Sequence, residues 1–188
     1  MVVLSFLTQT DFSILDFIAE HLRCGFLDRL MPALSKLADG GLIPILLALV
    51  LLAIPKTRRV GLAMGISFLL GLLFGNLILK NLVARPRPYQ LNPSAVLLIP
   101  ALSDYSFPSG HTLVVFETAV VLLKKGRGAA GVFALVMAVG IAFSRLYLYV
   151  HYPSDVLAGV LMGSAFGLIG CFLADKASDW LAERKKKG

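Results

Sequence analysis

Two histidines and one aspartate are the residues of this chain best suited to chemistry. His111 ends the stretch Pro108-Ser109-Gly110-His111, and Asp155 lies four residues after His151. At that spacing the carboxylate can hold one ring nitrogen of His151 and leave the other free to attack. A second histidine can supply the proton that a leaving oxygen needs. These residues therefore fit phosphoryl transfer through a histidine nucleophile, provided that other groups hold the phosphate.

Basic side chains and the start of a predicted helix could hold that phosphate. The residues concerned are Lys80, Arg85, Arg87, Arg145, Ser109 and Gly110. The N–H groups at a helix N-terminus bind oxyanions, and glycine lets the backbone approach them closely. Arginine grips two oxygens at once, whereas lysine acts as a point charge. Such a set fits a multiply charged oxyanion, most simply phosphate; the alternative is that the basic side chains extend to lipid headgroups.

The elements that must position these residues are membrane helices. Of the 188 residues, 57% are hydrophobic and 15% are charged, and the mean hydropathy is +0.82. A soluble domain carries about a quarter charged residues, so most soluble classes are excluded. The apolar residues gather in five runs, at 40–54, 61–79, 112–123, 128–143 and 156–174. We predict an all-α integral membrane bundle of five to six transmembrane helices.

Lysine and arginine gather in alternate connections between these runs and so predict the orientation. They follow the first, third and last runs, at 56–59, 124–127 and 176–187. The positive-inside rule places these segments in the cytoplasm and both His111 and His151 on the extracytoplasmic face of the cell membrane. The rule also explains the formal net charge of +7 without a nucleic-acid partner.

Three further features qualify this arrangement. Residues 11–38 carry apolar residues at helical spacing with charged residues between them, which is typical of an amphipathic helix at the membrane interface, with one tilted span as the alternative. Glu117 lies inside a predicted span, and we expect it to face the bundle interior. Glycines at four-residue spacing, as in 159–167, allow close helix packing within one bundle or in a homodimer. Two cysteines without metal-ligand spacing predict neither a metal nor a cofactor.

Three motifs, in order along the chain, resemble those of the type 2 phosphatidic acid phosphatase superfamily. Residues 80–88 match K-x6-R-P, residues 108–111 match P-S-G-H, and residues 144–155 match S-R-x5-H-x3-D. The resemblance covers about residues 40–175. It implies a membrane phosphatase domain there, between an interfacial region at 1–39 and a basic cytoplasmic tail at 176–188.

The resemblance also implies a role for each matched residue. His151 would be the nucleophile that forms a phosphohistidine, Asp155 would orient it, and His111 would protonate the leaving group. The phosphoryl oxygens would be bound by Lys80, Arg87, Ser109, Gly110 and Arg145. Arg85 lies outside the shared pattern, and two interpretations remain open: contact with a lipid headgroup or with the second phosphate of a diphosphate.

We therefore predict a metal-independent hydrolase that removes a terminal phosphate from a membrane lipid. Undecaprenyl diphosphate, which is recycled in cell-wall synthesis, is favoured because Arg85 could meet its second phosphate. The apolar loop at 88–107 could also lie beside a long hydrocarbon chain. Phosphatidic acid and phosphatidylglycerol phosphate are the alternatives, as is a phosphotransferase that passes the phosphoryl group to another lipid. A non-enzymatic lipid-binding protein is least favoured, because the motifs are intact.

Overall fold

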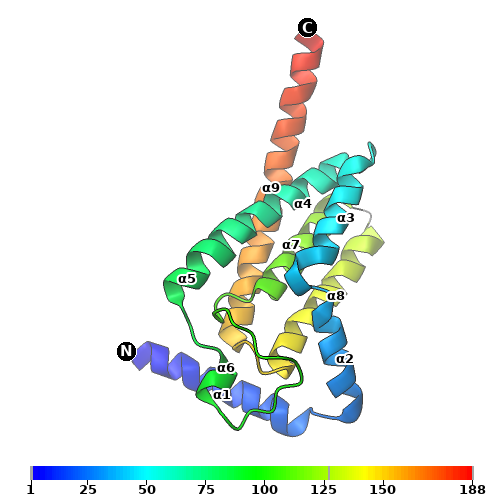
Figure 1. The fold of residues 1–188 in the computed structure, drawn as a ribbon. Coiled ribbons are helices and arrows are strands. Elements are labelled where there is room, and N and C mark those ends of the chain that lie inside the picture. The colour runs from blue at the N-terminus through cyan, green and yellow to red at the C-terminus, as the bar shows by residue number, and fades with distance from the viewer. Residues whose placement is uncertain (1, 127, 188) are drawn as a thin grey trace.

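The regular structure of the chain is helical. The computed structural model describes residues 2–126 and 128–187, and every regular element within them is a helix (Figure 1). Most of the elements form one bundle whose long axis runs toward the C-terminus of the chain. The elements are α1 (Val2–His21), α2 (Gly25–Lys36), η1 (Asp39–Gly41), α3 (Leu42–Ala53), α4 (Arg58–Leu70), the π-helical η2 (Gly71–Leu79), α5 (Lys80–Val83), α6 (Pro88–Leu91), α7 (Gly110–Lys125), α8 (Gly128–Tyr147) and α9 (Pro153–Lys187).

Four of the described helical stretches are long and apolar enough to cross a membrane. They are Gly25–Ala53, Arg58–Leu91, Gly128–Tyr147 and Pro153–Arg184. Large apolar side chains on their outer faces are exposed, among them Leu49, Val136 and Phe172. Such exposure is expected of helices whose outer faces contact lipid chains rather than water.

The fifth predicted span, α7, is a buried central helix. Its 16 residues give a length of about 24 Å, which is shorter than the roughly 30 Å of a hydrocarbon core. It packs against α4, α8 and α9, and nine of its residues from Thr112 to Leu122 are buried. Four helical stretches thus meet the length and hydropathy of a full span, slightly fewer than the predicted five to six, because α7 is shorter and lies inside the bundle.

Close packing between α7 and α9 places the N-terminal ends of these two helices side by side. A Cβ atom added to Gly159, Gly163 or Gly167 would lie 2.4–2.9 Å from an atom of Ser109 or α7, so larger side chains would separate the helices. The backbone N–H of Ser109 donates to the carbonyl of Asp155 at 3.2 Å. The glycines of α9 are thus used for packing within the chain.

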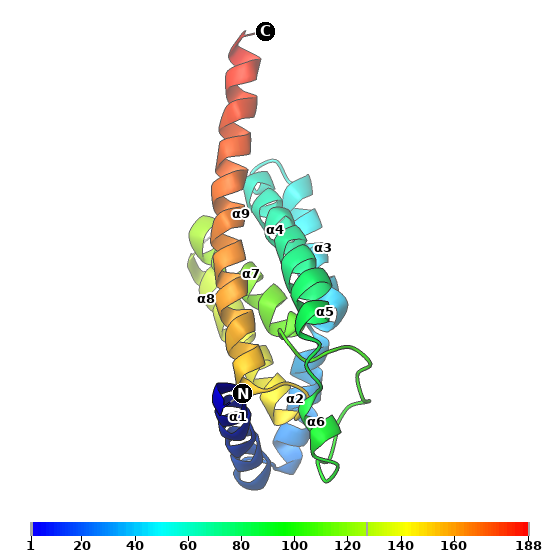
Figure 2. The ribbon, with the colours of Figure 1, turned by 90° about the vertical axis from the view of Figure 1, so that its left-hand side faces the viewer.

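The N-terminal region is divided into two differently placed helices. α1 lies across one end of the bundle, whereas α2 continues into α3 through η1 (Figures 1 and 2). Together α2, η1 and α3 form the 29-residue candidate span Gly25–Ala53. α2 is accommodated there because it packs on α8, where Asp28 accepts a hydrogen bond of 2.7 Å from the Tyr147 hydroxyl. This path of α2 favours the alternative of a tilted span for part of residues 11–38, and the interfacial region over residues 1–39 stays a prediction.

Candidate active site

The predicted site residues come together at the end of the bundle where α1 and α6 lie. His111 is in the first turn of α7, Arg145 in the last turn of α8, and Asp155 in the first turn of α9. His151 lies in the short connection between α8 and α9, and Arg87 lies just before α6. Arg87, Arg145, His151 and Asp155 are buried, with exposures of 0–1%. The charges of Arg87 and Arg145 act on both histidines, so all these groups share one electrostatic environment.

Asp155 and Arg87 approach opposite nitrogens of the His151 ring. Nδ1 lies 3.6 Å from Oδ2 of Asp155, and Arg87 Nη1 donates to Nε2 at 3.3 Å. A donor at Nε2 requires the neutral ring to carry its proton on Nδ1. The Asp155 oxygen is in turn held by Ser106 Oγ at 2.5 Å and by the Tyr152 N–H at 3.0 Å. This arrangement keeps a lone pair on Nε2, as a nucleophile requires.

The environment of His151 also keeps its ring neutral. Burial and the positive charges of Arg87 and Arg145 lower the pKa of His151 to about 3, against the opposing effect of Asp155. At neutral pH the ring is therefore the free base.

Asp104, which sequence reasoning did not identify, joins two of the predicted phosphate-binding cations. Its Oδ1 accepts from Arg87 Nη2 at 2.6 Å, and its Oδ2 lies 2.5 Å from Lys80 Nζ. Burial raises the pKa of Asp104, but hydrogen bonds and charges from Lys80 and Arg87 outweigh it and hold the pKa at about 2. The Asp104 side chain is 51% exposed. An anionic ligand that approaches Lys80 and Arg87 would therefore find the Asp104 carboxylate already bound to both cations.

Arg145 is a buried cation with unused hydrogen-bond donors. Its Nη1 contacts Ser35 Oγ, whereas Nε and Nη2 have no hydrogen-bond partner among the described residues. A buried donor without a partner costs about 1–3 kcal/mol. The charge of Arg145 acts on both histidines, and a phosphoryl group bound near it could satisfy the two free donors.

The start of α7 adds backbone donors to the site. Ser109 is the N-cap of α7, and its Oγ accepts from Thr112 Oγ1 at 2.9 Å. The first N–H groups of a helix have no partner within the helix and point beyond its start. A Cβ on Gly110 would lie 3.0 Å from Oδ1 of Asn76, so the glycine lets the η2 segment approach. Gly110 thus lies where an oxyanion could reach the backbone, whereas the N–H of Ser109 is already bonded to the carbonyl of Asp155.

Arg85 has two carboxylate partners within the chain. Its Nη1 donates to Oδ1 of Asp155 at 2.6 Å, and its Nη2 donates to Oδ2 of Asp11 at 2.7 Å. Its guanidinium carbon lies 3.7 Å from the centre of the Tyr152 ring. Both carboxylates are buried, and their ion pairs with Arg85 neutralise its charge. Arg85 therefore links Asp155 to Asp11 of α1, and its contact with a headgroup or a second phosphate stays a prediction.

His111 has a carboxylate partner of its own. Its Nε2 lies 2.8 Å from Oδ1 of Asp39, a residue of η1 that the sequence analysis did not select. The two residues are 72 positions apart in the chain. The only sequence signal for Asp39 is an acid followed by two glycines, and that pattern has no chemical specificity.

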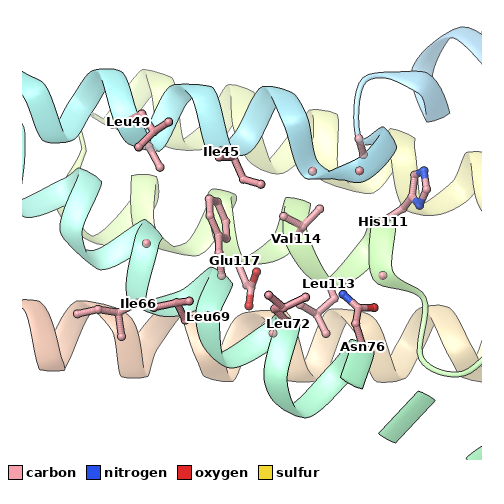
Figure 3. Close-up of a pocket in the computed structure, with 18 of the residues that line it drawn as sticks. Ile45, Leu49, Ile66, Leu69, Leu72, Asn76, His111, Leu113, Val114 and Glu117 are labelled. Carbon is pink, nitrogen blue, oxygen red and sulfur yellow. The ribbon is translucent and has the colours of Figure 1, made fainter. Parts of the chain in front are cut away.

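An apolar cavity of about 670 Å³ opens beside the site (Figure 3). It lies between α3, α4, η2 and α7, and its lining includes Leu49, Ile66 and Leu69. Lys80, Asp104 and His111 also belong to the lining, so the cavity extends from the bundle interior to the catalytic groups. Its shape and composition suit a hydrocarbon chain.

Glu117 faces this cavity from α7. The side chain is 1% exposed, and its Oε1 has no hydrogen-bond partner among the described residues. The expectation that Glu117 faces the bundle interior is confirmed. Gly71 makes room for it, because a Cβ there would lie 2.3 Å from Oε1.

Comparisons with known proteins give consistent results. The family model of the PAP2 superfamily matches residues 57–177. An undecaprenyl-diphosphatase of Sulfolobus acidocaldarius is 39% identical over 114 residues, which are 61% of this chain and 55% of that protein. The undecaprenyl-diphosphatase BcrC of Bacillus subtilis is 29% identical over 143 residues, 76% of this chain and 72% of that protein. The chain thus matches only about half the length of the Sulfolobus relative.

A solved structure has a similar fold over nearly the whole chain. It is the crystal structure of a transmembrane PAP2 type phosphatidylglycerolphosphate phosphatase from Bacillus subtilis. The TM-score is 0.74 at 27% sequence identity, and the match covers 90% of this chain and 86% of that one.

Proposed function

Since this chain belongs to the PAP2 superfamily, we propose that it is a membrane lipid phosphatase that works through a phosphohistidine on His151. Arg145 carries the proposal. It is a buried cation with two unpartnered N–H groups, and its charge acts on both His111 and His151. A phosphoryl group bound there would satisfy these donors and lie within reach of a nucleophile and an acid.

The proposed reaction has two halves. In the first, Nε2 of His151 attacks phosphorus, the bond to the leaving oxygen breaks, and His111 gives that oxygen a proton. In the second, His111 takes a proton from water, the oxygen of that water attacks the phosphohistidine, and phosphate leaves. Lys80, Arg87, Arg145 and the first N–H groups of α7 would stabilise the charge on the equatorial oxygens. None of these steps requires a metal, so EDTA should leave the activity unchanged.

For the substrate we propose undecaprenyl diphosphate. The supporting observations are the names of the two relatives and the apolar cavity that reaches Lys80 and His111. A lipid could enter that cavity sideways from the bilayer with its phosphate toward the cations. Arg85 no longer supports this choice, because its charge is taken up by Asp11 and Asp155. Phosphatidylglycerol phosphate is the second candidate, because the structural neighbour is named as a phosphatidylglycerolphosphate phosphatase.

Phosphate release decides among these substrates. The assay compares kcat/KM for undecaprenyl diphosphate, phosphatidic acid and phosphatidylglycerol phosphate in one detergent. His151→Ala serves as the inactive control, and trapping of acid-labile phosphoenzyme tests the intermediate. A phosphotransferase would instead form a new lipid phosphate when an acceptor lipid is added. Preference for either glycerolipid would remove the case for the diphosphate, and phosphate release by His151→Ala would remove the phosphohistidine.

We further propose that the site opens to the extracytoplasmic side and that the tail at 176–188 is cytoplasmic, on the basis of the lysine and arginine distribution. Single cysteines at Ser94 and Lys186 test this in a chain from which Cys24 and Cys171 have been removed. An impermeant thiol reagent on intact cells should label Ser94→Cys and spare Lys186→Cys. The opposite labelling would invert the orientation.

A further inference from the structure

We propose that Asp39 is a positioning residue for the acid step, acting through His111. The inference rests on the proposed function, because it concerns the group that protonates the leaving oxygen. The short contact between Asp39 Oδ1 and His111 Nε2, at 2.8 Å, carries it. With Nε2 bound to the carboxylate, only Nδ1 of His111 remains to serve the substrate.

The fold holds Asp39 in place by more than this contact. Asp39 begins η1, where Gly40 and Gly41 have φ values of +59° and +67°, a left-handed conformation that suits glycine. Ala38, just before it, is 2% exposed and packs in a cluster with Val115 and Phe116 of α7. η1 therefore rests on the helix that carries His111. The carboxylate is presented by a fixed turn and not by a free loop.

The two histidines then have separate carboxylates bound to opposite ring nitrogens. Asp155 lies beside Nδ1 of His151 and leaves Nε2 for attack. Asp39 binds Nε2 of His111 and leaves Nδ1 to give a proton once the ring is protonated. The nitrogen that each histidine keeps free for its own step is thus set by a different partner.

The negative charge of Asp39 also affects the protonation of His111. Burial and the charges of Arg145 and Arg87 all act against a proton on His111, whereas Asp39 acts in its favour through a hydrogen bond and its negative charge. An acid must hold a proton before it can give one. When Nδ1 gives its proton to the leaving oxygen, the ring becomes neutral and keeps its Nε2–H on Asp39, so the proton balance closes.

The test compares two leaving groups in Asp39→Asn, with Asp175→Asn as the matched control. Asp175 is also a half-exposed acid, paired with Lys125 at 2.5 Å, but it lies on α9 far from the site residues in sequence. For dodecyl phosphate, whose alkoxide needs a proton, Asp39→Asn should lower kcat about tenfold to a hundredfold. For 4-nitrophenyl phosphate, whose leaving group needs none, the change should stay within about threefold. Asp175→Asn should alter neither rate.

A double-mutant cycle and a spectrum separate positioning from other effects. In a His111→Ala background, Asp39→Asn should have no further effect on kcat. Nitrogen-15 NMR of labelled histidine should show the His111 proton on Nε2 in the parent and a mixture of tautomers in Asp39→Asn. Equal losses on both leaving groups, additive losses in the cycle, or an unchanged spectrum would overturn the role of Asp39. A parent enzyme that releases no phosphate from any ester would instead refute the proposed function, and the spectrum would still test the contact.

Discussion

Replacement of Arg145 by methionine should stabilise the protein while it abolishes turnover. Arg145 is 1% exposed, and its Nε and Nη2 have no partner among the described residues. Each buried unpaired donor costs about 1–3 kcal/mol, and the substitution removes two of them. It also leaves the Ser35 hydroxyl without its contact, which costs about 1 kcal/mol. The expected net gain is about 1–5 kcal/mol.

Thermal unfolding in one detergent, with and without inorganic phosphate, measures both effects. Phosphate at a hundred times its Kd should stabilise the parent by about 2.7 kcal/mol, because it binds only the folded chain. Arg145→Met should gain nothing from phosphate and should release none from lipid substrates. Arg184→Met is the control, since Arg184 is exposed on α9 and stacks on Trp180. An Arg145→Met protein that unfolds several degrees earlier, or that phosphate still stabilises, would refute the interpretation of Arg145 as an anion-binding group held at a cost in stability.

Three further outcomes are expected. The pKa of His151 is about 3 in the folded chain and about 6.5 in the unfolded chain, so unfolding below pH 6.5 takes up a proton. The free energy of unfolding should therefore fall by about 1.4 kcal/mol for each pH unit below 6.5. His151→Gln should flatten this slope in melting curves from pH 4 to 6. Arg85→Ala should lower kcat on the order of a hundredfold through misplacement of Asp155, with the ranking of diphosphate and monophosphate substrates unchanged; a selective loss of diphosphate activity would contradict this. Gly163→Ala should destabilise the chain by about 1–3 kcal/mol, because its Cβ would lie 2.4 Å from a carbonyl oxygen of α7; Gly65→Ala, with nothing within 4 Å, should be neutral in the same denaturation assay.

The sequence by itself determined the membrane class and the family, and it supplied the residues proposed for the site. Composition reveals a membrane protein, because apolar runs and their basic flanks are local properties of the chain. The three motifs are equally local, since residues such as His151 and Asp155 lie within one or two helical turns of each other. The exposed outer faces of the long helices and the burial of Arg87 and Arg145 agree with that reading.

Only the tertiary structure decided which partner each charged group has. Asp11 meets Arg85 across 74 positions, and Asp39 meets His111 across 72; no spacing rule connects residues so far apart. Arg85 looked like a free cation in the sequence, but helix packing places it between two carboxylates. The same packing makes α7 a buried central helix, because a helix of 16 residues can be apolar enough for a central or an outer position. Long-range pairing and burial depend on how the helices are arranged, and that arrangement is a property of the folded chain.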